Sequence, residues 1–288
     1  MTLVRDASEP AAARDRGEGA RAPLPWLKLL AGFAALLAVA PLIAVAALGL
    51  FGDATADLSP AVIGRYAATS AALAALVAVG AGAAGASAAW LVVMYRFPGR
   101  DLFAWALALP LAAPAFALAY AYADLFDVAG PVRTALRGVL GFDVPLEMRS
   151  LWGAAFVLSA AFYPYVYLTA RSAFVNQSVC ALEAARTLGA RRGDVFFRVA
   201  LPLARPALAA GMALAVMETL ADYGAVNFLS VQTLTTGVVR AWSVFGSPAS
   251  AARLSLLLLA AAALLLIVER LGRRGAFSAS SARWRPLN

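Results

Sequence analysis

Residues 183–202 read EAARTLGARRGDVFFRVALP, and this polar, arginine-rich stretch lies between two long apolar runs. The residues before Gly189 are mostly good helix formers, and Gly189 can adopt the left-handed conformation that ends a helix. Asp194 is predicted to N-cap a second helical stretch, 194–201, and Pro202 then interrupts the backbone before the next apolar run. The stretch therefore predicts two short helices at an angle to each other on one face of a membrane.

The composition of the whole chain is that of a membrane protein. Hydrophobic residues make up 62% and charged residues 14% of the 288 residues, whereas soluble domains carry about 25% charged residues. A spanning helix needs roughly 20 apolar residues. We expect six such helices, at 27–51, 66–95, 102–126, 151–170, 206–228 and 250–269. The fold class is therefore all-α and polytopic, with six transmembrane helices in one domain.

The positive charges favour one orientation in the membrane. With the six helices placed as above and the N-terminus inside, 18 of the 24 Lys and Arg residues fall on the inner side and six on the outer side. The positive-inside rule then places both termini and the loop 171–206 in the cytoplasm. Net charge is +8, and because the charges lie mostly in these loops, we expect membrane lipid and not nucleic acid as the partner of this charge.

Three parts follow from this reading of the chain. Residues 1–23 mix charges of both signs with Ala, Gly and Pro and are expected to form a disordered cytoplasmic tail. Residues 24–270 form the transmembrane domain, and 271–288 form a basic cytoplasmic tail. A signal peptide is the alternative for the N-terminal region, but the apolar run exceeds the 7–15 residues usual for such a segment. We therefore expect a retained anchor.

Two local patterns predict how the helices pack and bend. Residues 79–89 read VGAGAAGASAA, and small residues of this kind allow another helix to approach closely. Pro110 and Pro114 predict a bend in the third helix. Between the third and fourth helices, a short helix is expected near 132–140.

Two acids interrupt the fifth apolar run. Glu218 and Asp222 are four residues apart and would share one face of a continuous helix. Each acid in a membrane helix costs about 2.5–3.5 kcal/mol on insertion scales, so the two need water, a partner or protonation. They could form a cation-attracting wall of a translocation path together with Tyr223 and Asn227. Alternatively, they form a structural pair satisfied by Thr, Tyr or Arg on a neighbouring helix.

The spacing in 183–202 resembles the EAA motif of ATP-binding-cassette (ABC) transporter permeases. That motif reads EAA, three residues, Gly, nine residues, then Ile-x-Leu-Pro, and here only Val199 departs from it by replacing Ile. In this family the loop carries a helix that docks on a cytoplasmic ATPase subunit. The resemblance implies coupling to the ATPase through Glu183, Ala184, Ala185, Gly189, Leu201 and Pro202.

Four longer segments look like the permeases of bacterial ferric-iron uptake systems. They are FYPYVYLTARSAF (162–174), LEAARTLGARRGDVFFRVALPLARPALAAG (182–211), METLADYG (217–224) and VQTLTTGVVRAW (231–242). Thiamine and phosphonate permeases are close relatives of this type. Ferric permeases usually fuse two six-helix halves in one chain, and this chain resembles the first half. The resemblance implies a second half, either a copy of this chain or a separate chain, and a periplasmic binding protein that delivers iron.

The expected role is therefore that of an inner-membrane importer subunit without covalent chemistry of its own. No phosphate loop of the form GxxxxGK[ST] is present, so a partner would supply ATP hydrolysis, and no cofactor is expected. The chain has no His, and its single cysteine, Cys180, is expected to be a reduced thiol in an inner loop. No stable metal site is expected, because a tight iron site would trap the cargo.

Two functions of other classes compete with the importer. A proton-coupled secondary carrier would use Glu218 and Asp222 as a proton relay and would need no ATPase. An intramembrane aspartyl protease would need two acids on separate helices, whereas these two lie on one predicted helix.

Overall fold

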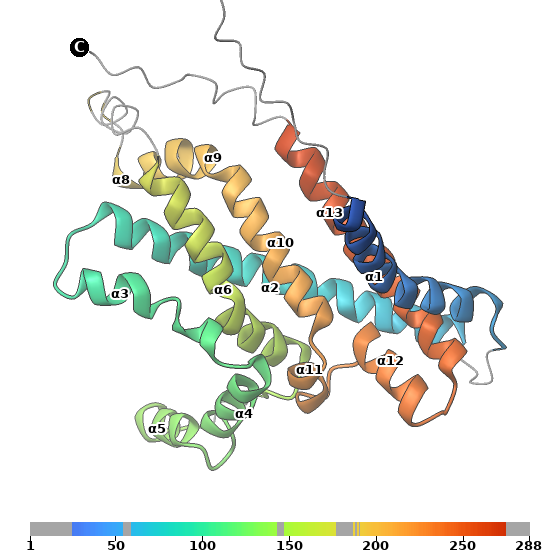
Figure 1. Cartoon of the computed structure of the whole chain (residues 1–288). Coiled ribbons are helices and arrows are strands. Elements are labelled where there is room, and N and C mark those ends of the chain that lie inside the picture. Colours follow the sequence, from blue (N-terminus) through green and yellow to red (C-terminus); the bar gives the residue numbers. More distant parts are fainter. Residues whose placement is uncertain are drawn as a thin grey trace, which may run out of the picture. The chain divides into compact units, whose positions relative to one another are not determined.

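The computed structural model describes residues 25–53, 59–142, 147–176, 187, 189 and 191–274. In these residues the regular structure is helical, which confirms the predicted all-α class (Figure 1). In chain order the helices are α1 (Pro25–Phe51), α2 (Pro60–Met94), α3 (Arg100–Ala106), η1 (Leu109–Ala112), α4 (Ala115–Leu125), α5 (Pro131–Leu140), α6 (Leu151–Val175), α8 (Arg192–Val195), η2 (Phe196–Ala200), α9 (Leu201–Leu203), α10 (Arg205–Ala221), α11 (Gly224–Phe228), α12 (Leu234–Ser243) and α13 (Pro248–Arg274). The predicted tail 1–23 and residues 275–288 of the predicted tail 271–288 lie outside the described residues. Residues 271–274 of that tail instead form the end of α13.

The chain divides into two units, Met1–Ala44 and Val45–Asn288. The first contains most of α1, which is helical on both sides of Pro41. All other helices belong to the second unit, together with the last turns of α1. There the side chain of Arg253 on α13 donates hydrogen bonds to the carbonyls of Gly49 and Gly52. A cationic side chain thus binds carbonyl groups at the C-terminal end of α1, where they have no partner within the helix.

Four helices in the described residues are long and apolar enough to span a membrane, in α1, α2, α6 and α13. Two bent pairs bring the count to as many as six. Arg100–Ala112 and Ala115–Leu125 meet at 101°, and Gly193–Leu203 and Arg205–Ala221 meet at 74°. The predicted six spans are therefore matched by four unbroken helices and, where each bent pair counts as one span, by two broken ones. Pro114 lies at the first break, where proline was expected to bend the chain.

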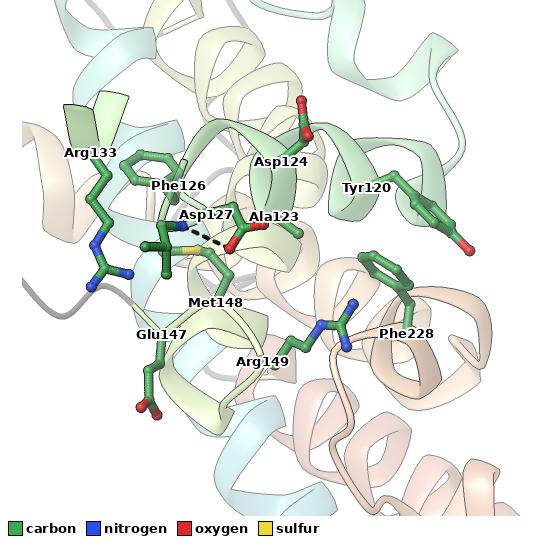
Figure 2. A pocket seen from close by; sticks show the side chains of 11 residues that line it. Tyr120, Ala123, Asp124, Phe126, Asp127, Arg133, Glu147, Met148, Arg149 and Phe228 are labelled. Carbon is green, nitrogen blue, oxygen red and sulfur yellow. Dashed lines mark hydrogen bonds between the residues drawn. The ribbon is translucent and has the colours of Figure 1, made fainter. Parts of the chain in front are cut away.

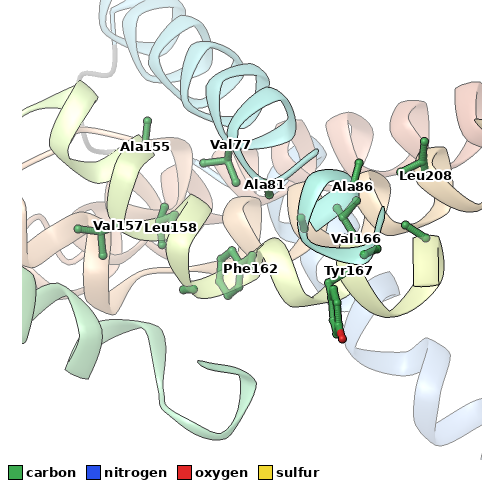
Figure 3. Close-up of a cluster of buried hydrophobic side chains, with 14 of the residues drawn as sticks. Val77, Ala81, Ala86, Ala155, Val157, Leu158, Phe162, Val166, Tyr167 and Leu208 are labelled. Atoms are coloured by element: carbon green, nitrogen blue, oxygen red, sulfur yellow. The ribbon is translucent and has the colours of Figure 1, made fainter. Parts of the chain in front are cut away.

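The predicted small-residue stretch of α2 packs closely against α6. A Cβ on Gly85 would lie 2.7 Å from the Tyr163 carbonyl oxygen and 2.8 Å from the Tyr167 nitrogen. The two backbones meet here because Gly85 has no side chain, which confirms the close approach expected from the sequence. Around this contact, buried side chains from α2, α6 and α10 form the core (Figure 3). Tyr167 is fully buried in it and donates a hydrogen bond to the Ala104 carbonyl.

α5 forms where a short helix was expected, between the third and fourth spans. α6 begins at Leu151 after Ser150, whose hydroxyl accepts a hydrogen bond from the Gly153 amide. This N-cap satisfies one of the free amides at the start of the helix. α12 begins in the same manner, with a reciprocal capping box between Thr233 and Thr236.

Candidate functional site

The predicted coupling residues are only partly within the described chain. Glu183, Ala184 and Ala185 lie outside it. Gly189 has φ +85°, and an added Cβ would meet nothing within 4 Å. The left-handed conformation, and not a lack of space, therefore requires glycine here. The positive φ predicted for Gly189 is confirmed.

Leu201 and Pro202 start the short helix α9, which ends just before the bend into α10. Asp194 was predicted to N-cap the second helical stretch, and this prediction is wrong. α8 already begins at Arg192, and Asp194 instead forms an exposed ion pair with Arg198 at 3.4 Å. The segment before Pro202 is a π-helix, η2, in which the Leu201 amide donates to the Phe196 carbonyl. Proline has no amide to donate, and a wider turn in front of it accommodates the missing hydrogen bond.

An aromatic cluster fixes this segment to the helix core. The ring of Phe196 lies 5.1 Å from that of Trp90 on α2, and Trp90 contacts Phe174 on α6 edge-to-face at 5.5 Å. The next residue, Phe197, is exposed. A single phenylalanine of the segment therefore packs on Trp90 of α2, which in turn contacts Phe174 of α6, and no local sequence pattern indicated this contact.

The fifth apolar run does not form the continuous helix predicted for 206–228. α10 ends at Ala221, and Asp222 leaves the helix with φ −68° and ψ 127°. Its Oδ1 accepts hydrogen bonds from the amides of Ala225 (2.9 Å) and Val226 (3.1 Å) at the start of α11. Asp is a preferred N-cap because its carboxylate accepts hydrogen bonds from the backbone amides of the first turn, which have no partner within the helix. The prediction that Glu218 and Asp222 share one face of a continuous helix is therefore wrong.

Glu218 has a partner on a neighbouring helix. The Tyr165 hydroxyl of α6 donates a hydrogen bond of 3.3 Å to its Oε1. The sequence left open a structural pairing with Thr, Tyr or Arg, and Tyr165 is such a partner. Residues 165 and 218 lie far apart in sequence, so no local pattern indicated this contact.

A cavity of about 410 Å³ brings together three of the four predicted path residues, Glu218, Asp222 and Tyr223. Its remaining wall comes from α6 and from the break between η1 and α4. The fourth residue, Asn227, lines a different cavity of about 390 Å³, and Tyr223 lines both. We call these the acidic cavity and the Arg240 cavity, after the charged side chains that line them.

A third cavity of about 560 Å³ lies between α4, the loop before α6, and α11 (Figure 2). Phe228, at the end of α11, stacks on Tyr120 at 3.8 Å and lies 5.3 Å from the guanidinium of Arg149. The aromatic rings and the cation bind the free end of α11, because a guanidinium is attracted to an aromatic face. α11 is therefore fixed at its start by Asp222 and at its end by this stack.

Residues 77–274 match the family described as binding-protein-dependent transport system inner membrane component. The chain belongs to this family. It is accordingly a multi-pass inner-membrane component of a transport system, in agreement with the resemblance drawn from the EAA spacing.

Relatives of this chain are named for the transport of different substrates. The sulfate transport system permease protein CysT of Escherichia coli is 36% identical over 142 residues, covering 49% of this chain and 50% of that protein. The molybdenum permease ModB of Escherichia coli is 31% identical, covering 59% and 75%. The Fe(3+) permease FbpB 2 of Haemophilus influenzae is 25% identical, covering 58% and 29%. The chain spans about half the length of the sulfate permeases it matches.

A solved structure supports the fold. A chain of a bacterial alginate ABC transporter, in complex with an alginate pentasaccharide-bound periplasmic protein, matches with a TM-score of 0.69. The two are 15% identical, and the match covers 87% of this chain and 94% of that one. At this identity the likeness concerns the fold alone, and it confirms the ABC importer permease-like bundle.

Proposed function

We propose that the chain is the transmembrane subunit of an ABC importer and performs no hydrolysis itself. The family match over residues 77–274 carries this proposal. A cytoplasmic ATPase would dock on the loop 171–206, and a periplasmic binding protein would deliver cargo on the opposite side. Both termini would be cytoplasmic, as the distribution of Lys and Arg predicts.

The working unit would contain two such halves, either two copies of this chain or this chain with a second one. The acidic cavity is lined by helices of a single bundle. A translocation path between two halves would need the second half to form its opposite wall. Reconstitution with the ATPase and binding protein, followed by counting of permease chains per complex, tests this. Transport by a complex with a single permease chain would contradict it.

As cargo we propose ferric iron. The four segments that look like ferric permeases, including METLADYG at 217–224, support this choice, as does the relative FbpB 2. Fe(III) is a hard cation that prefers carboxylate and hydroxyl oxygens, and the acidic cavity offers Glu218, Asp222 and the hydroxyls of Tyr165 and Tyr223. Both hydrogen bonds of Asp222 use Oδ1, so Oδ2 is not engaged by them.

An oxyanion is the second candidate cargo. The sulfate and molybdenum permeases are more similar to this chain than the ferric one, at 36% and 31% against 25% identity. Uptake of radiolabelled iron, molybdate, sulfate, phosphonate and thiamine into proteoliposomes that contain the complete complex separates these cargoes. Iron uptake that the other compounds do not reduce is the expected result, and uptake of molybdate or sulfate alone would favour the second candidate.

The same vesicles separate the importer from a proton-coupled carrier. An importer loses uptake when ATP is removed and keeps it when an uncoupler collapses the proton gradient. The opposite result would assign the chain to the carrier class, with Glu218 and Asp222 as candidate proton-binding groups.

A substitution at Gly189 tests the coupling role of the loop. Gly189→Val forces a β-branched residue into a left-handed conformation, at a cost of about 1–2 kcal/mol for an ordinary L-residue, and should reduce ATPase association and transport while membrane insertion survives. Gly193→Val is the matched control, because Gly193 lies in α8 with nothing within 4 Å of an added Cβ and without a positive φ. Normal transport by stable Gly189→Val protein would contradict the assignment of the loop.

A further inference from the structure

The Arg240 cavity has lining chemistry opposite to that of the acidic cavity. Among the described residues that line it, Arg240 is the only charged side chain, and the others include Asn227, Gln232, Ser230 and Thr236. The acidic cavity is lined by Glu218 and Asp222 and, within the described chain, by no Lys or Arg. Tyr223 belongs to both walls. The chain therefore presents two neighbouring cavities of opposite charge.

Several polar groups of the Arg240 cavity are free to bind a ligand. Within the described part of the chain, the guanidinium of Arg240 makes no hydrogen bond or ion pair, and its side chain is exposed. The same holds for the side-chain amides of Asn227 and Gln232. By contrast, the Thr236 hydroxyl is used in the capping box with Thr233. One cation and two amides thus remain as donors at a single cavity.

The backbone at this cavity is held in an unusual conformation. Ser230 has φ 61°, and it is the only non-glycine residue with positive φ in the described chain. The Ser230 amide donates to the Asn227 carbonyl at 3.1 Å, and the Val231 amide donates to the Val226 carbonyl at 2.9 Å. These bonds fix the tight turn that carries Ser230 and Gln232 into the cavity wall. Strained conformations of this kind persist where the surrounding structure requires them, often at binding sites.

We propose that the Arg240 cavity is a binding site for a tetrahedral oxyanion group, such as molybdate, sulfate or a phosphonate. A guanidinium can donate two parallel hydrogen bonds to such a group. The amides of Asn227 and Gln232 can donate to further oxygens, and the absence of an acid among the described lining residues leaves the positive charge uncompensated. The site shares Tyr223 with the acidic cavity and holds Asn227 of the predicted path, but neither Glu218 nor Asp222 lines it. It therefore goes beyond the proposed ferric-iron role and does not depend on that role.

The same chemistry can come from a soluble oxyanion or from a lipid headgroup phosphate. The experiment therefore has two arms on the full chain, purified in a detergent without phosphate. Calorimetry measures binding of molybdate, sulfate and methylphosphonate, and native mass spectrometry measures retained phosphatidylglycerol. Neither arm needs ATP, the ATPase or transport, so failure of the importer proposal and failure of this site are distinguishable.

We expect Arg240→Gln to weaken binding about tenfold or more, since a charge-assisted pair is worth at least one such factor. Arg240→Lys should recover part of the affinity, because it restores charge without the planar guanidinium. Arg65→Gln is the matched control, as Arg65 is an exposed arginine of α2 that does not line the cavity. It should bind as the unaltered chain does.

Each outcome of the two arms either supports the proposed site or overturns it. Arg240-dependent binding of the soluble anions supports the site and assigns it to a soluble ligand, whereas Arg240-dependent retention of phosphatidylglycerol alone supports the site and assigns it to a headgroup. Absence of binding at millimolar concentration in both arms overturns the proposal. So does an equal loss in Arg65→Gln, which would indicate general attraction to positive charge. Arg240 is exposed, and unchanged melting of Arg240→Gln protein excludes unfolding as the cause of lost binding.

Discussion

α2 and α6 form an unbroken, tightly packed pair, whereas the chain from α10 to α12 is broken twice and is lined with cavities. At the first pair, Gly85 allows the two backbones into direct contact, and Val77 of α2 and Leu158 of α6 are fully buried. In the second region, an acid ends a helix and fixes the start of α11. The Arg240 cavity, which α11 and α12 help to line, holds the unbonded guanidinium and amides described above, and the acidic cavity holds Glu218 and Asp222.

The difference indicates that the α2–α6 pair is the rigid part of the bundle and that the chain from α10 to α12 is the adaptable part. Small-residue packing leaves little freedom, because interiors of this density tolerate few changes in volume. Short helices joined at capped breaks can shift relative to one another at the cost of a few hydrogen bonds. Polar groups in a membrane are also costly, so their concentration in one region is a sign of function.

The largest effect is expected from closing the gap between α2 and α6. Gly85→Leu places a large side chain where even a Cβ would lie 2.7 Å from the Tyr163 carbonyl oxygen. Overpacking of this kind typically costs about 1–3 kcal/mol and here meets backbone that cannot give way, so folded protein should be largely lost. Size-exclusion profiles in detergent measure this. Gly64→Leu, on the same helix with nothing within 4 Å of an added Cβ, should remain folded. If Gly85→Leu and Gly64→Leu gave equal amounts of folded protein, the α2–α6 contact would not be the tightly packed region described above.

A smaller effect is expected where the tightly packed pair meets the coupling segment. Phe196→Ala removes the ring that contacts Trp90, and because Phe196 is only partly buried, the cost should lie well below the roughly 3–5 kcal/mol of a fully buried phenylalanine. Thermal melting should therefore fall, and ATP hydrolysis should rise relative to transport, because the segment is no longer fixed to α2 and α6. Phe197→Ala removes an equal ring from an exposed position and should change neither. A matching loss of coupling in both variants would contradict the role given to Phe196.

The rigid region could be predicted from the sequence far better than the broken one. The small residues at 79–89 are a local signal, and so is the positive φ of Gly189, because glycine alone adopts that conformation without strain. The break at Asp222 has only a weak signal, since Asp followed closely by Gly is compatible with a helix that continues. The pairing of Glu218 with Tyr165 depends on tertiary packing and could not be read from either segment. The π-turn before Pro202 shows the same limit, as proline predicts an interruption but not its form.

The smallest change in stability, and the sharpest test of the comparison, is expected at Asp222. Asp222→Asn keeps an oxygen that can accept from the Ala225 and Val226 amides, so the cap and the fold should survive with little loss. Asp222→Ala removes the cap and should cost about 0.5–2 kcal/mol, which a lower melting temperature would reveal. If the carboxylate also attracts a cationic cargo, Asp222→Asn should slow iron uptake per folded molecule, and Asp222→Lys should slow it more through repulsion. If uptake per folded molecule is unchanged in Asp222→Asn, the acid is purely a cap. Asp222 would then have no part in cation selection, and Glu218 would be the remaining acid of the acidic cavity to test.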